Sequence, residues 1–268
     1  MTDNAARANA IHAPRASARV FAIANQKGGV GKTTTAINLG ASLGALERRV
    51  LVIDCDPQGN ATRGLGLDAE PPNHYHVLSD QAAALDAVRP TAFDNLHVLP
   101  ADRDLVGIEV EVVGEEGWAL RMREAIATLR DRYDEILLDC PPSLGHLTVN
   151  ALTAADAVLV PLQCEYFALE GISELISTVE RIRGSLNPAL ALEGVVLTMY
   201  DDRTNLARDV ADEVRRHFAD RVYRAIVPRN VRLAEAPSHG TPILHYDARS
   251  RGATAYLAVA QELLERTR

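Results

Sequence analysis

Short apolar runs alternate along the chain with longer stretches in which apolar residues recur every three or four positions. The runs at 19–25, 49–54 and 135–139 are continuous, which predicts strands covered on both faces, as in a parallel sheet. Residues 33–46 have helical spacing and predict a helix. By the same criteria we expect strands at 95–99, 156–161 and 192–198, and helices at 118–130, 169–184, 203–218 and 252–266. The alternation predicts an α/β fold, a mostly parallel twisted sheet with helices on both faces.

The first 18 residues lack this periodicity. They are rich in Ala, Asn and Arg and contain Pro14, which predicts a disordered tail, so we expect residues 19–268 to form one domain. The segment from Asp56 to about Pro72 is punctuated by glycine and proline and is expected to be irregular. The chain has neither a run of 18 apolar residues nor an apolar leader, so we expect a cytoplasmic protein without a transmembrane helix.

A glycine-rich loop joins the first predicted strand to the first predicted helix. Such a loop brings backbone N–H groups together at a helix N-terminus, and glycine lets the backbone approach phosphate oxygens closely. We expect Lys32 to reach the β and γ phosphates of ATP and the Thr33 hydroxyl to bind Mg²⁺. The residues expected to bind the nucleotide here are Lys27, Gly28, Gly29, Val30, Gly31, Lys32, Thr33 and Thr34.

This loop departs from the ordinary P-loop pattern. The pattern places a glycine five residues before Gly31, and Gln26 stands there instead. Lys27 occupies the loop entrance. Lys27 and Lys32 are the two lysines of the chain, and the other 26 of its 28 basic residues are arginine. A compact ammonium on a flexible stem fits against a phosphate where the wider guanidinium would not. The two lysines therefore point to phosphate chemistry at this loop.

Carboxylates end two of the predicted strands. Asp54 and Asp56 follow the second apolar run, and Asp139 ends the run at 135–139. Open α/β sheets bind ligands at the carboxyl ends of their strands, and a P-loop ATPase needs such an aspartate beside its magnesium. Each aspartate alone could serve a turn or a helix cap. Together with a phosphate loop, the three favour a nucleotide site.

Three cysteines, Cys55, Cys140 and Cys164, show no C-x-x-C spacing, which fits a reducing compartment. Cys55 and Cys140 adjoin the strand ends, a position that raises the alternative of an iron–sulfur cluster. Such a cluster needs several grouped thiolates, so we expect small buried side chains instead.

Four segments carry a resemblance to a known family. They are 25–35, 54–62, 138–144 and 228–240, the last reading Pro-Arg-Asn-Val-Arg-Leu-Ala-Glu-Ala-Pro-Ser-His-Gly. On these motifs the chain resembles the ParA/Soj partitioning ATPases, within the deviant Walker A group of P-loop proteins that also contains MinD.

The resemblance implies an ATPase that uses ATP and Mg²⁺ and forms a face-to-face homodimer when ATP is bound. Lys27 would then enter the partner's site, so that Lys27, Lys32 and Asp56 form the catalytic set, with Asp56 positioning or activating the attacking water. Thr33, Asp54 and Asp139 would serve the metal. Pro228 and Asn230 would line the adenine site. Hydrolysis would be slow until a ParB-like centromere-binding protein completes the geometry, as expected of a timed switch in chromosome or plasmid partitioning.

Charge is consistent with this picture but does not establish it. The net charge of −8 argues against indiscriminate binding to nucleic acid. Eight arginines nevertheless lie between 203 and 232, and arginine binds backbone phosphate without reading sequence. A solvated, salt-bridged helix explains the charge equally well. The resemblance favours non-specific binding to double-stranded DNA by the ATP dimer, through Arg203, Arg229 and Arg232, and hence a nucleoid-associated protein.

Two other functions stay open. A MinD-like membrane ATPase would need a basic amphipathic helix beyond the fold, whereas the last segment, 256–266, carries two glutamates and is expected to dock on the core. A cargo-positioning ATPase that does not bind DNA is the other alternative.

Overall fold

The computed structural model describes residues 17–111, 114–166 and 168–267. Most of the predicted tail lies outside these residues. Ala18, which we assigned to the tail, is buried, and its backbone N–H donates to the Arg130 carbonyl at 2.8 Å. Ala18 therefore packs with the domain, one residue before the predicted boundary.

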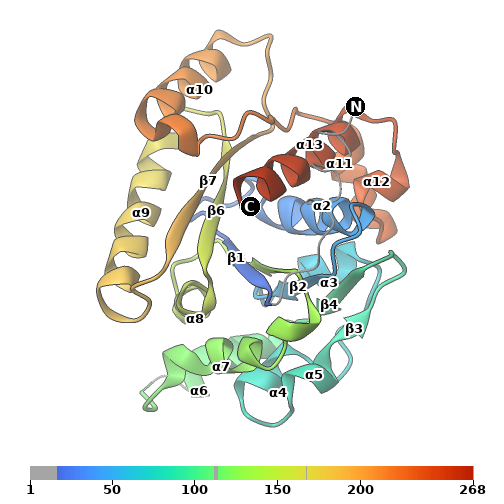
Figure 1. Ribbon diagram of the computed structural model, residues 1–268, viewed down its shortest axis with the longest axis vertical. Coiled ribbons are helices and arrows are strands. Elements are labelled where there is room, and N and C mark those ends of the chain that lie inside the picture. Colours follow the sequence, from blue (N-terminus) through green and yellow to red (C-terminus); the bar gives the residue numbers. More distant parts are fainter. Residues whose placement is uncertain (1–16, 112–113, 167, 268) are drawn as a thin grey trace, which may run out of the picture.

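One seven-stranded sheet forms the centre of the molecule, in the order β3-β4-β2-β5-β1-β6-β7 (Figure 1). All neighbouring strands are parallel except β3 and β4. The strands are β1 (Arg19–Ile23), β2 (Val50–Asp54), β3 (Arg89–Pro90), β4 (Leu96–Leu99), β5 (Glu135–Asp139), β6 (Ala157–Gln163) and β7 (Ala191–Thr198). The predicted fold class is confirmed, because β1, β2 and β5 are buried on both faces as their continuous apolar runs indicate.

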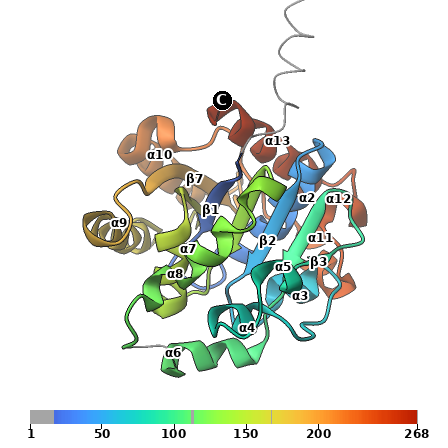
Figure 2. The same ribbon diagram turned by 60° about the horizontal axis from the view of Figure 1, so that its bottom comes forward.

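Helices cover both faces of the sheet. One face carries α2 (Lys32–Ala45), α13 (Arg251–Arg266), α3 (Asn60–Gly64), α11 (Val231–Glu235) and α12 (Ile243–Tyr246). The other carries α4 (His74–Leu78), α5 (Ala84–Ala87), α6 (Ile108–Glu111), α7 (Arg121–Ala127), α8 (His146–Ala154), α9 (Ala168–Ser185) and α10 (Asn205–Phe218). Figure 2 brings the side with α4, α6, α7 and α8 forward. Two separate apolar cores result, one on each side of the sheet.

The predicted helix at 118–130 is wrong as a single element. The structure has a 3₁₀ turn at Trp118–Leu120, α7, and a second 3₁₀ turn at Arg130–Arg132. Gly117, with φ of 82°, precedes the first turn. The remaining 3₁₀ turns are at Arg103–Gly107, Ala219–Arg221 and Ala236–His239. The short helices α3, α4, α5, α6, α8, α11 and α12 were not predicted, because segments of four to nine residues show too few turns for a period. The helix α3 lies within residues 56–72, so the expectation that this whole segment is irregular is wrong.

The two edges of the sheet differ. β3 has two residues, one of them Pro90. At the opposite edge, the segment 222–228 lies along β7, where the Tyr223 and Val227 N–H groups donate to the Val195 and Leu197 carbonyls at 2.9 Å each. Within the described residues, no helix is long and apolar enough to span a membrane.

Candidate nucleotide site

The loop between β1 and α2 is shaped for a phosphate. Gly29 and Gly31 have φ of 75° and 91°, left-handed values that favour glycine, and Gly31 caps the N-terminus of α2. Val30 between them is buried, and its carbonyl accepts a hydrogen bond from the Thr198 hydroxyl at 2.8 Å. This hydrogen bond anchors the loop to the end of β7. The loop leads directly into the N-terminus of the 14-residue helix α2, whose free N–H groups can bind an anion.

A cavity of about 630 Å³ lies over this loop. It lies at the carboxyl ends of the strands, as expected for an open parallel sheet. Of the residues predicted for the site, those that line it are Gly28, Gly29, Gly31, Lys32, Thr33, Thr34, Asp56, Pro228 and Asn230, with Arg229 from the predicted DNA set. The cavity lining does not include Lys27, Val30, Asp54 or Asp139.

Lys32 is the buried cation of the site. Lys32 is only 7% exposed, and its Nζ donates a hydrogen bond to the Lys27 carbonyl at 3.0 Å. Burial lowers the pKa of Lys32, whereas the nearby charges of Asp139 and Asp56 act to raise it. Bound phosphate would add negative charge and further hydrogen-bond acceptors, so the ammonium is placed to gain from an anion.

Asp54 is held at the end of β2 by hydrogen bonds. Its Oδ2 accepts from both the backbone N–H and the hydroxyl of Thr62, each at 2.8 Å, and its Oδ1 accepts from the Asp56 N–H at 3.2 Å. Burial raises the pKa of Asp54 to about 6, and the hydrogen bonds from Thr62 act against that shift. Asp54 thus supports the turn between β2 and α3 and contributes charge below the cavity.

Asp139 lies beside Asp54 on the neighbouring strand, in direct register. It is fully buried, and neither carboxylate oxygen has a hydrogen-bond partner of normal geometry among the described residues. Burial raises its pKa well above the usual range, the Asp54 charge adds to this, and the nearby Thr33 hydroxyl acts in the opposite direction. Two buried oxygens without donors, next to a threonine hydroxyl and a second carboxylate, fit the oxygen ligands and water shell that Mg²⁺ prefers.

Asp56 is the carboxylate that reaches the cavity. Its Oδ1 accepts from the Gln58 N–H at 2.9 Å, which fixes the side chain in the turn after β2. Oδ2 receives no hydrogen bond from the part of the chain that the structure describes. One oxygen is therefore available to a water or a ligand in the cavity.

Lys27 leaves the loop in another direction. Its backbone N–H donates to Asn25 Oδ1 at 3.0 Å, and Asn25 Nδ2 donates to the Pro161 carbonyl at 2.8 Å. The ammonium forms an ion pair with Glu165 Oε2, also at 2.8 Å. Two lysines of one loop are thus divided between two tasks, with Lys32 inside the cavity and Lys27 at its outside.

Sequence reasoning missed part of the cavity wall. Thr198, Met199 and Tyr256 line it, as do Gln58 and Asn60 from the turn after β2. Thr198 ends β7, so the rule that placed Asp54 and Asp139 could also have found it. Nothing in the local sequence identifies Tyr256, which comes from α13 near the end of the chain.

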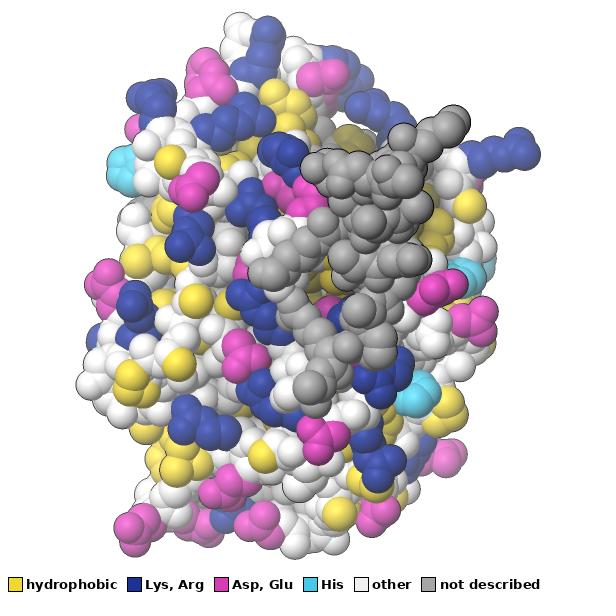
Figure 3. All heavy atoms as spheres, viewed as in Figure 1, with side chains coloured by type: hydrophobic (Ala, Val, Ile, Leu, Met, Phe, Trp, Pro, Cys, Tyr) yellow, Lys and Arg dark blue, Asp and Glu magenta, His cyan; other side chains and the backbone are white. Residues whose placement is uncertain are grey.

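The three predicted DNA-binding arginines differ in their surroundings. Arg203 forms a two-point ion pair with Asp201, at 2.6 and 2.8 Å, and holds the pKa of that carboxyl down to about 2. Arg232 pairs with Glu235 at 2.9 Å. Arg229 is exposed at the cavity rim, and its side chain makes no hydrogen bond or ion pair with the described residues. On the face shown in Figure 3, basic and acidic side chains are interspersed.

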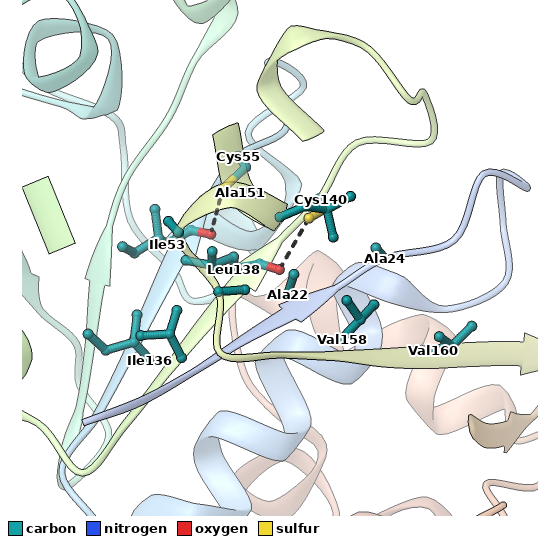
Figure 4. Packing of buried hydrophobic residues seen from close by; sticks show 14 of the residues in the cluster. Ala22, Ala24, Ile53, Cys55, Ile136, Leu138, Cys140, Ala151, Val158 and Val160 are labelled. Carbon is teal, nitrogen blue, oxygen red and sulfur yellow. Dashed lines mark hydrogen bonds between the residues drawn. The ribbon is translucent and has the colours of Figure 1, made fainter. Parts of the chain in front are cut away.

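All three cysteines are buried and form no disulfide. Cys55 and Cys140 are buried, and each thiol points back to a carbonyl of its own strand, Ile53 or Leu138, at 3.6 and 3.7 Å (Figure 4). Burial raises the pKa of both thiols. The described residues contain no group of three or more His, Cys, Asp and Glu side chains that could hold a metal ion by themselves.

Comparison with known proteins gives consistent matches. A family model described as an AAA domain matches residues 18–192. The chromosome partitioning protein ParA of Caulobacter vibrioides is 55% identical over 254 residues, covering 93% of this chain and 95% of that protein. The sporulation initiation inhibitor protein Soj of Bacillus subtilis is 52% identical over 247 residues, covering 91% and 98%.

Solved structures agree. Cobyrinic acid a,c-diamide synthase from Mycobacterium smegmatis, with bound ADP and magnesium, has a TM-score of 0.82 at 38% identity, over 93% of this chain and 95% of that chain. The septum site-determining protein MinD of Pyrococcus horikoshii, complexed with Mg-ADP, has a TM-score of 0.76 at 27% identity, over 92% and 96%.

Proposed function

The chain belongs to the ParA/Soj family of chromosome-partitioning ATPases, and we propose that it is an ATP-driven switch that segregates DNA through a nucleotide-dependent dimer. As a member of this family it is an ATPase that uses ATP and Mg²⁺. The observation that carries the further proposal is the division of the two lysines, with Lys32 buried in the cavity and the Lys27 ammonium outside it.

Within one chain, the site binds and orients ATP. The N–H groups at the start of α2 and the Lys32 ammonium would hold the phosphates, and Pro228 and Asn230 with Tyr256 would enclose the base. Thr33, Asp54 and Asp139 would hold Mg²⁺, which neutralises phosphate charge when bound. Asp56 has an oxygen free to orient the attacking water and to receive its proton.

Lys27 supports the dimer part of the proposal. Its side chain does not line its own cavity, and it is 37% exposed, so a second molecule can reach it. An ammonium inserted into the partner's site would meet the negative charge of bound ATP. Dimerisation would then depend on the nucleotide and end after hydrolysis.

The dimer would carry the DNA function. Two copies joined across their nucleotide sites would place two Arg229 side chains in one assembly. Each arginine can contact a DNA phosphate without reading the sequence, so the dimer would bind DNA more tightly than one copy. A ParB-like partner would accelerate hydrolysis and so release the dimer from DNA. We place the protein in the cytoplasm, associated with the nucleoid.

The test uses Asp56→Ala, with Asp68→Ala as a control for an exposed aspartate of the following segment. Losing the water-positioning carboxylate should reduce phosphate release by about 10²- to 10⁴-fold while ATP affinity stays within about threefold. The variant should accumulate as a dimer in light scattering and retard any duplex DNA. Normal turnover by Asp56→Ala would refute the assignment. ATP-dependent binding to anionic liposomes without DNA retardation would transfer the function to a membrane.

A further inference from the structure

The Lys27–Glu165 ion pair joins the loop between β1 and α2 to the segment that follows β6. Lys27 Nζ lies 2.8 Å from Glu165 Oε2, and the two side chains are 37% and 45% exposed. Glu165 follows β6, two residues after its last member Gln163. The pair thus lies outside the cavity, and it engages the same Lys27 side chain that the proposed dimer requires.

Glu165 is itself held in place. Its Oε1 accepts a hydrogen bond from the Gln163 side chain, and its backbone N–H donates to the Gln163 carbonyl at 2.9 Å. Its carbonyl accepts from the Ala168 N–H at 2.9 Å, at the start of α9. Lys27 is fixed from the other side through Asn25, which is bonded to the Pro161 carbonyl of the same strand. Both partners of the ion pair are therefore anchored by hydrogen bonds to the same strand, β6.

The exposure of the pair limits its strength. A half-exposed ion pair shifts an equilibrium by no more than about fivefold, because water solvates both charges well. It is strong enough to favour one direction of the Lys27 side chain. It is also weak enough to yield when a triphosphate with several negative charges approaches.

We propose that Glu165 is a positioning residue for Lys27, which it holds in the free monomer and releases when a second copy brings bound ATP. This inference rests on the proposed function, since it assumes that Lys27 acts in the partner's site. Glu165 would then weaken ATP-dependent dimerisation, because each dimer that forms must break two such ion pairs.

The test compares three variants by sedimentation at fixed ATP. Glu165→Gln removes the charge and should tighten dimerisation by about 3- to 25-fold, the square of the effect expected for one exposed pair. Glu165→Asp keeps the carboxylate and should restore part of the wild-type effect. Glu180→Gln removes an equal charge from the exposed face of α9 and should change nothing. The affinity of the monomer for ATP should be the same in all three.

A second measurement reads Lys27 directly. The chain contains two lysines, so a protein labelled with ¹³C-lysine gives two sets of side-chain signals, which Lys27→Gln assigns. Without nucleotide, Glu165→Gln should move the Lys27 Hε and Cε signals and leave those of Lys32 in place. Glu180→Gln should move neither.

The outcomes separate the two proposals. A wild-type protein that binds ATP but stays monomeric at every concentration refutes the dimer of the proposed function. A lysine spectrum unchanged by Glu165→Gln refutes the assignment of Glu165, whatever the oligomeric state. Dimerisation that is unchanged or weakened by Glu165→Gln also overturns it, because a residue that only restrains Lys27 cannot be needed in the dimer.

Discussion

At the scale of single residues, a buried histidine lies directly behind the nucleotide site. His74 is fully buried, and its Nδ1 is 2.6 Å from the Asp54 backbone carbonyl. Since a carbonyl can only accept, Nδ1 carries the proton, and Nε2 is buried without a partner among the described residues. Burial lowers the pKa of His74 to about 4, so the ring is neutral wherever the protein is folded near neutral pH.

This histidine should make stability depend on pH. The unfolded chain takes up a proton near pH 6.5 and the folded chain near pH 4, so stability is present above pH 6.5 and is lost as the pH falls between these values. From pH 7 to pH 5 the loss should be about 2 kcal/mol in the free energy of unfolding. His74→Leu should remove this part of the slope in urea titrations at the two pH values.

The control is the same exchange at the exposed His217, compared at the same two pH values. Asp54 acts with the opposite sign, because burial raises its pKa to about 6 and protonation then favours the folded state. The difference between His74→Leu and wild type isolates the histidine. Equal slopes for the two proteins would show that His74 is not the group responsible.

At the scale of elements, α13 supports the helix that begins at the phosphate loop. The two helices pack against each other on one face of the sheet (Figure 1). The Tyr256 hydroxyl of α13 lies 3.1 Å from the hydroxyl of Thr35, in the first turn of α2, and both side chains are buried. Tyr256 also lines the cavity, so the end of the chain contributes both to the wall of the site and to the position of its helix.

A double-mutant cycle measures this contact. Tyr256→Phe leaves the Thr35 hydroxyl without its partner and should lower the free energy of unfolding by about 1–2 kcal/mol. Thr35→Val in the same chain removes the stranded hydroxyl and should recover part of that loss. Additive effects of the two substitutions in urea unfolding would mean that the hydroxyls do not interact.

The sequence predicted the elements that repeat a period over several turns and missed those that do not. β5 was predicted at its observed bounds, and α2, α9 and α13 to within one residue at each end, since their apolar faces are continuous. Most residues of the candidate site were predicted in the same way, because the carboxyl ends of the parallel strands and the glycine-rich loop lie at the same edge of the sheet. Tyr256 and Glu165 were out of reach, since only the folded chain brings α13 and the end of β6 to the loop.

At the scale of the whole molecule, basic side chains lie among acidic ones on the face shown in Figure 3, and two of the three arginines predicted to bind DNA are in ion pairs. Arg203 and Arg232, which the sequence placed at DNA, are both in ion pairs, whereas Arg229 makes no ion pair with the described side chains. A DNA phosphate must displace Asp201 or Glu235 at the first two positions, whereas Arg229, which is near the charge of Asp201, has no ion pair with the described side chains to break. We therefore expect Arg229 to contribute most.

Arg229→Glu should weaken DNA binding by the ATP dimer by about tenfold or more, and it should reduce the slope of log K against log salt by about one for each DNA phosphate that is no longer neutralised. Arg203→Glu should have a smaller effect. Arg132→Glu makes the same charge change next to β5 at the amino ends of the strands, far from the cavity, and is the control. Fluorescence anisotropy at about 50 to 200 mM salt distinguishes them. Equal effects of Arg229→Glu and Arg132→Glu would mean that only net charge matters.

The protected edges of the sheet have a consequence for the proposed cycle of association and dissociation. A proline in a two-residue strand closes one edge to further pairing, and the segment 222–228 occupies the other. Among the described residues, neither edge of the sheet therefore offers a bare strand on which further copies could stack into open-ended fibres. In the proposed dimer, copies would meet at the nucleotide face, where hydrolysis of ATP would end the contact.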